Sequence, residues 1–291
     1  MPSHIYCRVG RYADSLTANR AAEKVDETYI AETGATGVYP IGYYSHNVHF
    51  GLVSAQLLGD AKAVLASAEK LDKWLGNDVA TAIPIAQPVK AAPYFAWAQY
   101  GDPDMVLALS DPVDAPPYVK AMRHYARGIA FAKNQDTSGA RREAEAIRGI
   151  AAATDWSVLD AWAIPARPVL DVAENVAAAR AAQAENNTGA AIGFWRKAAS
   201  SEDTIPYMEP PFWYYPVRQS LGAALLKSGD APGARKEFQA ALERSRGSAW
   251  ALYGLEQAAK ASGDTEGEKK AAANLANSWR GDPGLLSLEN L

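Results

Sequence analysis

Apolar and small residues recur along this chain at intervals of three and four, and short polar breaks interrupt them. Around the break at Gly229-Asp230, these positions are Leu221, Gly222 and Leu225 before it and Ala234, Phe238 and Ala241 after it. Such spacing marks one face of an α-helix. Glycine readily adopts the left-handed conformation that ends a helix, and aspartate can cap the helix that follows. The pattern therefore predicts two antiparallel helices joined by a short turn.

The same break recurs along the chain as Gly, Gln or Asn, then Asp or Asn, then an alanine-rich run. The breaks are Gly59-Asp60, Gly101-Asp102, Gln135-Asp136, Asn186-Asn187, Gly229-Asp230 and Gly263-Asp264, with a weaker copy at Gly10-Arg11. Two of the steps between them, from Gly101 to Gln135 and from Gly229 to Gly263, are 34 residues long. Repetition with this period is typical of stacked helical hairpins. We therefore expect an all-α fold in which residues 1–291 form a single domain.

The other steps are longer, at 49, 42, 51 and 43 residues, so extra segments lie between several hairpins. As a group these insertions are rich in proline, tyrosine and tryptophan; they read "YIAETGATGVYPIGYY", "GNDVATAIPIAQP", "ATDWSVLDAWAIPARP" and "SSEDTIPYMEPPFWYYP". Insertions in repeat arrays usually emerge on one face and often carry the binding site. The alternative is that they are spacers that adjust how the helices stack.

The small and large residues at these offsets resemble the tetratricopeptide repeat (TPR), a helix–turn–helix unit of about 34 residues. The resemblance is strongest over residues 117–149 and 216–245 and weaker over 45–75 and 246–279. It implies a right-handed superhelical α-solenoid of about seven TPR-like repeats, with aromatic and proline-rich insertions. In this family the first helices of the repeats line a concave groove. The groove commonly holds a peptide, a protein segment or a small ligand.

Four phrases are similar to a narrower group of longer bacterial TPR proteins: "MPSHIYCRVGRYADS", "YYSHNVHF", "RHYARGIAFA" and "YMEPPFWYYPVRQSLGAALL". Those proteins continue upstream with another histidine-bearing helical segment, so this chain is expected to correspond to their C-terminal part. A fragment, a trimmed form and a naturally short version all fit. Residues 1–9 are too short for a complete first helix, so the first repeat is expected to be uncapped. Its apolar edge would suit a homo-oligomer contact.

All four histidines of the chain fall on expected first helices. The resemblance implies that His4, His46 and His49 face the groove, whereas His124 occupies a position that usually packs inside its hairpin. Neutral imidazoles bind zinc, copper or iron, and three of them leave a position open for water or substrate. One hypothesis is therefore a transition-metal site of His4, His46 and His49, with His124 as a fourth ligand. The alternative is that the histidines are polar groove residues that bind a peptide or a small anion.

The stretch "YMEPPFWYYPVRQ" is the second candidate site. Two prolines after Glu209 favour extended backbone, and the aromatic residues that follow, Trp213 among them, offer flat amphipathic surfaces. Arg218 can grip a ligand carboxylate or pair with Glu209. Tyr43 and Tyr44, just before the histidine pair, are the other expected ligand contacts. Packing of this insertion over the groove is the structural alternative.

Charge and composition exclude several classes of protein. A net charge of −4 argues against a nucleic-acid partner, which needs a basic face. No apolar run approaches the roughly 20 residues that a membrane span requires. The single cysteine, Cys7, excludes an internal disulfide, and a catalytic pair with His4 would rest on one spacing alone. The chain contains none of the common sequence motifs of nucleotide-binding loops or serine hydrolases.

Three classes of function remain. The first is a binding scaffold that uses the concave groove, and we favour it because it needs only the architecture. The second is a metal-dependent enzyme or metal-binding protein that uses the groove histidines. The third is an oligomeric structural component that uses the uncapped edge. The opening residues lack the layout of a signal peptide, and a cytoplasmic protein and a mature exported one would look alike.

Overall fold

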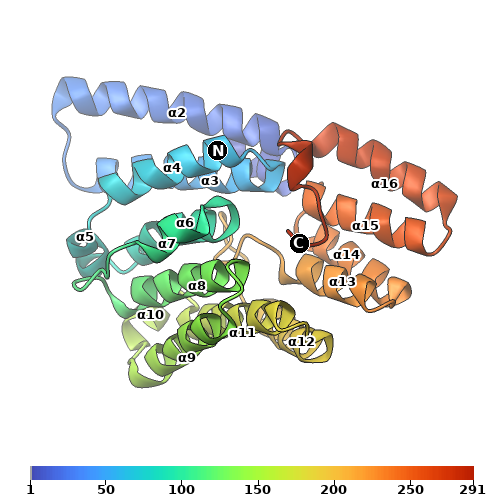
Figure 1. Cartoon of the computed structure of the whole chain (residues 1–291). Coiled ribbons are helices and arrows are strands. Elements are labelled where there is room, and N and C mark those ends of the chain that lie inside the picture. The colour runs from blue at the N-terminus through green and yellow to red at the C-terminus, as the bar shows by residue number, and fades with distance from the viewer. Residues whose placement is uncertain (1) are drawn as a thin grey trace.

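The computed structural model describes residues 2–291, and all regular secondary structure in that range is helical (Figure 1). Six pairs of helices that are consecutive in the chain pack against each other. They are α1 (Pro2–Arg8) with α2 (Tyr12–Thr33), α3 (Ser45–Leu58) with α4 (Ala61–Trp74), α8 (Pro117–Lys133) with α9 (Thr137–Ala153), α11 (Ala166–Ala184) with α12 (Thr188–Asp203), α13 (Val217–Lys227) with α14 (Ala231–Arg244), and α15 (Ala249–Ala261) with α16 (Thr265–Ser278). The all-α prediction is confirmed.

The remaining elements join these pairs. Helix α6 (Ala86–Tyr100) packs between α4 and α8. Short elements occupy the connections: the π-helix η1 (Tyr39–Tyr44), α5 (Asn77–Ala82), α7 (Pro103–Leu107), α10 (Ser157–Ala161) and the 3₁₀ turn η2 (Pro283–Leu285). The insertion between α12 and α13 forms no helix, and its residues Phe212, Trp213 and Tyr214 are buried in the main core. This insertion thus fills the interior of the array.

Most turns have the chemistry that the sequence predicts. A side-chain oxygen accepts a hydrogen bond from the backbone N–H three residues on at Asp60, Asp136, Asn187, Asp230 and Asp264. The residue before each of them has a positive φ, namely Gly59, Gln135, Asn186, Gly229 and Gly263. The first residue therefore ends one helix in the left-handed conformation, and the second caps the next.

The turn at Gly101 differs from this expectation. Its backbone is extended, with φ −70° and ψ 147°, so α6 does not end in a left-handed residue. A Cβ atom at this position would lie 2.6 Å from the carbonyl oxygen of Trp97 and 2.9 Å from the Val106 side chain. Glycine is required here because the chain passes close to α7, and its conformational freedom is secondary.

Close packing between neighbouring pairs depends on small residues facing a large one. The Phe238 ring on α14 is fully buried between Gly222 on α13 and Gly254 on α15. A Cβ atom would lie 2.8 Å from this ring at Gly222 and 2.1 Å from it at Gly254. Because no side chain intervenes, the three helices approach one another closely.

The N-terminal and C-terminal regions of the chain lie side by side (Figure 1, blue and red). Helix α15 contacts α3, and Trp250 donates from Nε1 to the carbonyl oxygen of Gln56 at 3.3 Å. After α16, the backbone N–H of Arg280 donates to the carbonyl oxygen of Leu58 at 3.1 Å. The C-terminal end of the helix array therefore contacts its N-terminal end.

None of the helices in residues 2–291 combines the length and the apolarity that crossing a membrane requires.

Candidate functional site

Two of the predicted histidines meet near the N-terminus. His4 on α1 and His46 in the first turn of α3 have their Nε2 atoms 3.1 Å apart. His4 also donates from Nδ1 to Oε2 of Glu209 at 2.9 Å. Glu209 comes from the insertion before α13 and accepts a further hydrogen bond from the Tyr207 hydroxyl. We call His4, His46 and Glu209 the histidine cluster.

The hydrogen bonds of this cluster orient the His4 ring. Its Nδ1 donates to the carboxylate of Glu209, so its Nε2 faces His46. Burial, followed by the nearby charge of His4, lowers the pKa of His46 to about 4. His46 is therefore a neutral imidazole at neutral pH, and its tautomer decides whether its Nε2 donates to His4 or accepts from it.

The other two histidines lie elsewhere. The ring of His49 is buried against Tyr214, and its Nε2 has no hydrogen-bond partner within residues 2–291. His124 instead pairs with Glu143 at 2.5 Å, and Arg127 binds the same carboxylate. Of the four histidines predicted as metal ligands, only His4 and His46 are therefore in hydrogen-bond contact. Across residues 2–291, no group of three or more His, Cys, Asp or Glu side chains has an arrangement that could hold a metal ion.

Cys7, on the same helix as His4, is a poor nucleophile in this setting. Burial, and then the negative charge of Glu209, raise the pKa of its thiol to about 12. The sulfur is therefore protonated at neutral pH, whereas a catalytic cysteine needs a thiolate. The structure gives no support to a Cys7–His4 catalytic pair.

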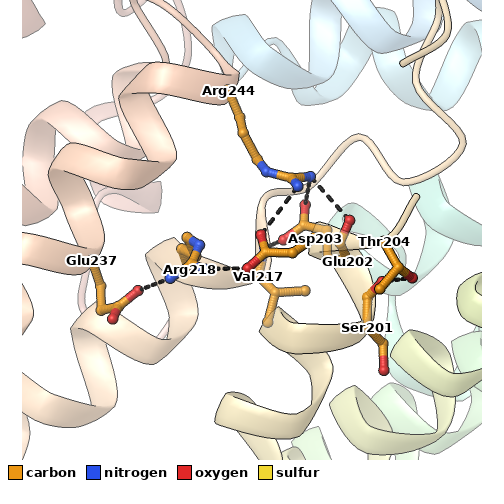
Figure 2. Close-up of polar contacts among 8 residues, drawn as sticks. All are labelled: Ser201, Glu202, Asp203, Thr204, Val217, Arg218, Glu237 and Arg244. Carbon is orange, nitrogen blue, oxygen red and sulfur yellow. Dashed lines mark hydrogen bonds and ion pairs between the residues drawn. The ribbon is translucent and has the colours of Figure 1, made fainter. Parts of the chain in front are cut away.

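Arg218, another predicted ligand contact, forms ion pairs within the fold (Figure 2). Its guanidinium binds Oε2 of Glu237 at 2.6 Å and also the carboxylate of Asp203. Arg244 binds the other oxygen of Asp203 at 3.1 Å. Arg218 thus links α12, α13 and α14, and it pairs with these two acids and not with Glu209.

Glu202 lies next to this group of charges and holds the start of α13. Its Oε2 accepts a hydrogen bond from the backbone N–H of Val217 at 3.0 Å (Figure 2). Burial raises the pKa of Glu202 to about 7 despite the opposing effect of Arg244. The group of charges in Figure 2 therefore anchors the end of the aromatic insertion.

The two predicted tyrosines point away from any cavity. Tyr43 is 63% exposed and packs only against Tyr39 among aromatic neighbours. Tyr44 is buried, and its hydroxyl donates to Glu27 on α2 at 2.8 Å. Both belong to η1, which packs against α2 and α3.

A cavity of about 440 Å³ lies among the inner helices and is lined by residues of α3, α6, α8, α11, α12, α13, α15 and the aromatic insertion. Its aromatic lining consists mainly of Tyr100, Tyr125, Trp195, Trp213, Tyr215 and Trp250. Trp213 is therefore the one predicted ligand contact that lies in this wall. A cavity of this size suits a small molecule or a few residues of peptide.

Two cations in the cavity wall have no acidic partner among the described residues. Arg180 on α11 stacks over the Trp195 ring at 5.1 Å. Its guanidinium donates to the backbone oxygens of Glu289 and Leu291 and pairs with no side-chain acid within residues 2–291. Lys133, at the end of α8, donates only to the carbonyl oxygens of Ala98 and Gln99. Desolvation in the concave wall, and then the positive charge of Arg180, lower the pKa of Lys133 to about 8. This wall therefore carries uncompensated positive charge.

Several polar atoms in the same wall lack partners. Oε1 of Gln56, Nε1 of Trp195 and Oγ of Ser220 have no hydrogen-bond partner within residues 2–291. Each of these residues is at most 2% exposed. Buried polar atoms are almost always hydrogen-bonded, so these three atoms are polar groups near the cavity that the fold itself leaves unpaired.

The sequence prediction missed the residues that give this wall its charge and polarity. Arg180 had a signal, because it is the only charged residue in the run "VAAARAAQA" (176–184). A lone arginine among alanines that pack in a core is costly unless it serves a ligand or a buried acceptor. Gln56 and Ser220 had no comparable signal.

No known protein-family model matches this chain, and no curated protein sequence matches it.

Proposed function

We propose that this protein is a TPR-like binding protein, a right-handed α-solenoid whose concave side holds an extended peptide that carries main-chain or carboxylate oxygens. The observation that carries the proposal is the cavity of about 440 Å³ whose wall holds Arg180 and Lys133, two cations that donate to backbone oxygens and pair with no side-chain acid within residues 2–291. The repeated turns and capped hairpins support the repeat architecture.

Charge and aromatic surface together favour such a ligand. A guanidinium without an acid partner binds carboxylate or carbonyl oxygens through several donors at once. A peptide oxygen would also offset the desolvation that lowers the pKa values of Arg180 and Lys133. Tyr125, Trp213 and Trp250 supply large rigid surfaces for apolar side chains at low entropic cost.

The proposal is tested by selecting peptides from a displayed random library and measuring their affinity by fluorescence anisotropy. We expect Arg180→Gln to weaken binding of the selected peptides by about tenfold or more, because a charged hydrogen bond is worth about 1.5–3 kcal/mol. Arg142→Gln is the matched control, since Arg142 is exposed on the outer part of α9 and binds only Ser138.

Both variants should keep the circular dichroism spectrum of the parent. Peptides that bind the parent and Arg180→Gln equally well would show that they occupy another surface. A library that yields no binder at all would also count against the proposal.

The histidine cluster supports a second candidate function, metal binding. Two nitrogens that each lie about 2.1 Å from one ion and 3.1 Å from each other subtend an angle of about 95°, which is usual in metal coordination. Glu209 binds the other nitrogen of His4, as carboxylates do when they orient a metal-bound histidine. His4 and His46 would supply two ligands to zinc, copper or iron, and the rest would come from water or a bound partner.

Metal content decides this second candidate, measured by elemental analysis on protein purified without a histidine tag. We expect about one transition-metal ion per chain in the parent and in His124→Ala, whose imidazole pairs with Glu143 away from the histidine cluster. His46→Ala should lose the ion while its helical content stays the same. A metal-free parent, or a His46→Ala variant that retains the metal, would contradict the assignment.

A further inference from the structure

The last residues of the described chain lie in the mouth of the cavity. After η2, residues 286–291 have no regular helix, and Leu285, Glu289 and Asn290 line the cavity wall. Leu291 is 1% exposed and belongs to the main hydrophobic core. We call residues 283–291 the tail.

The cavity holds the tail through main-chain oxygens. Arg180 donates from Nη2 to the backbone oxygen of Leu291 at 2.6 Å and from Nη1 to that of Glu289 at 3.3 Å. The hydroxyl of Tyr215 donates to the carbonyl oxygen of Asn290 at 2.9 Å. Each of these acceptors exists in any peptide, so the contacts demand little specific sequence.

Side chains of the tail add mainly apolar contact. Leu285, Leu286 and Leu288 are partly buried against the core, in addition to Leu291. The one ion pair, between Glu289 and Lys227 at 3.0 Å, is largely exposed and therefore contributes little. The tail thus presents leucine side chains and backbone oxygens, the chemistry that the proposed function assigns to the ligand.

The tail is also weakly tied to the rest of the fold. Its own structure is limited to η2 and a few turn hydrogen bonds, such as the one from the side chain of Asn290 to the carbonyl oxygen of Leu285. The helix pairs before it pack without its help, because each pair contacts its neighbours directly. Detaching the tail therefore costs few contacts beyond those with the cavity.

We infer that the tail is a built-in occupant of the cavity, which a leucine-containing peptide from another chain displaces by taking over the same donors of Arg180 and Tyr215. The inference rests on the proposed function and names its ligand class. Because a tethered segment competes at an effective concentration in the millimolar range, an external peptide binds more weakly while the tail is seated. Release of the tail would therefore switch binding on.

The test uses a fluorescein-labelled synthetic peptide with the sequence of residues 283–291, titrated into the full-length protein. Leu291→Ser removes the buried anchor of the tail, and we expect it to bind the probe about tenfold more tightly than the parent does. Leu159→Ser is the matched control, because Leu159 on α10 is a buried leucine, 4% exposed, and does not line the cavity. It should bind like the parent.

Hydrogen exchange gives a second measurement that needs no variant. Saturating probe should speed the exchange of amides in residues 284–291 of the parent and leave those of α11 protected. Unchanged tail exchange at saturation, or equal affinities for the parent and Leu291→Ser, would overturn the inference.

Arg180→Gln separates the two proposals. If it weakens the probe in both backgrounds while the parent and Leu291→Ser bind equally, the cavity is a peptide site without an internal competitor, and only the inference falls. If Leu291→Ser with Arg180 intact does not bind the probe at all, a separate peptide cannot replace the tail, and the inference falls. If the selected peptides also bind the parent and Arg180→Gln with equal affinity, the proposed function falls as well.

Discussion

The histidine cluster and the cavity differ in how fully their polar atoms are paired. In the cluster, His4 contacts both His46 and Glu209, and Glu209 also binds a tyrosine hydroxyl. In the cavity wall, by contrast, two cations lack an acid, and three buried polar atoms lack any partner within residues 2–291. A cluster that satisfies itself can be structural, whereas a wall with unpaired polar groups is the better candidate for a binding site.

The difference also reflects residue type. Histidines are scarce in this chain and attract notice in a sequence, and two of them do meet. The cavity uses common residues that lie far apart in sequence. The scarcity of histidine therefore identified the contact between His4 and His46. Unpaired buried polar atoms identified the cavity wall as the candidate binding surface.

Trp213→Ala should give the largest loss of stability. It removes a wall residue of the cavity that lies in the same insertion as Glu209 of the histidine cluster. Trp213 packs against Phe95 and Tyr125 in the cavity wall, four residues after Glu209. Removing a buried tryptophan costs about 3–5 kcal/mol of unfolding free energy. We expect such a loss in urea denaturation, together with loss of peptide binding. Trp162→Ala, at a position 51% exposed, should change stability by less than about 0.5 kcal/mol; similar losses in both would show that Trp213 is not a wall residue.

Glu202→Gln tests how the group of charges at the start of α13 makes stability depend on pH. Since the folded pKa is raised to about 7, folded Glu202 keeps a proton that the unfolded chain releases above its ordinary pKa near 4.5. The parent should therefore lose up to about 3 kcal/mol of stability at this site as pH rises from about 4.5 to 7. Glu202→Gln should flatten that slope in urea denaturation at a series of pH values. The exposed Glu243→Gln is the control and should keep the slope of the parent.

His49→Leu tests the opposite slope beside the histidine cluster. Burial, and then the charge of His46, lower the pKa of His49 to about 3, so the unfolded chain gains a proton there before the folded one does. Stability is complete above pH 6.5 and falls as pH drops toward 3, by about 2 kcal/mol at pH 5. We expect His49→Leu to lose less stability between pH 7.5 and 5 than the parent. Val53→Ala, buried on the same helix, should destabilise equally at both values.

Tyr43→Ala should have the smallest effect. Its side chain is exposed on η1 and does not line the cavity, although the sequence suggested a ligand contact. We expect a change in unfolding free energy below about 0.5 kcal/mol and no change in peptide affinity. Weakened binding of the selected peptides would extend the binding surface to η1.

Features that depend on residues close together in the sequence could be predicted, and features that depend on residues far apart could not. The turns are local, so Gly229-Asp230 predicts a left-handed residue and a cap, and both are present. Gly101 departs from the pattern because its backbone is extended, and glycine is needed there to avoid the Trp97 carbonyl and the Val106 side chain; the Gly-Asp pair alone does not distinguish these two roles. Arg218 pairs with acids on neighbouring helices that no spacing in its own segment shows. The cavity wall depends wholly on such distant contacts, and only the lone Arg180 among alanines gave a local hint.

The contact between α3 and α15 has a mechanical meaning. An open stack of helical hairpins can change its curvature, so its inner surface can adapt to ligands of different width. Here the hydrogen bond from Trp250 on α15 to Gln56 on α3 joins the two ends of the array. This contact limits changes in the width of the cavity between the helices. Under the proposed function, a cavity of fixed width would select its ligands by size.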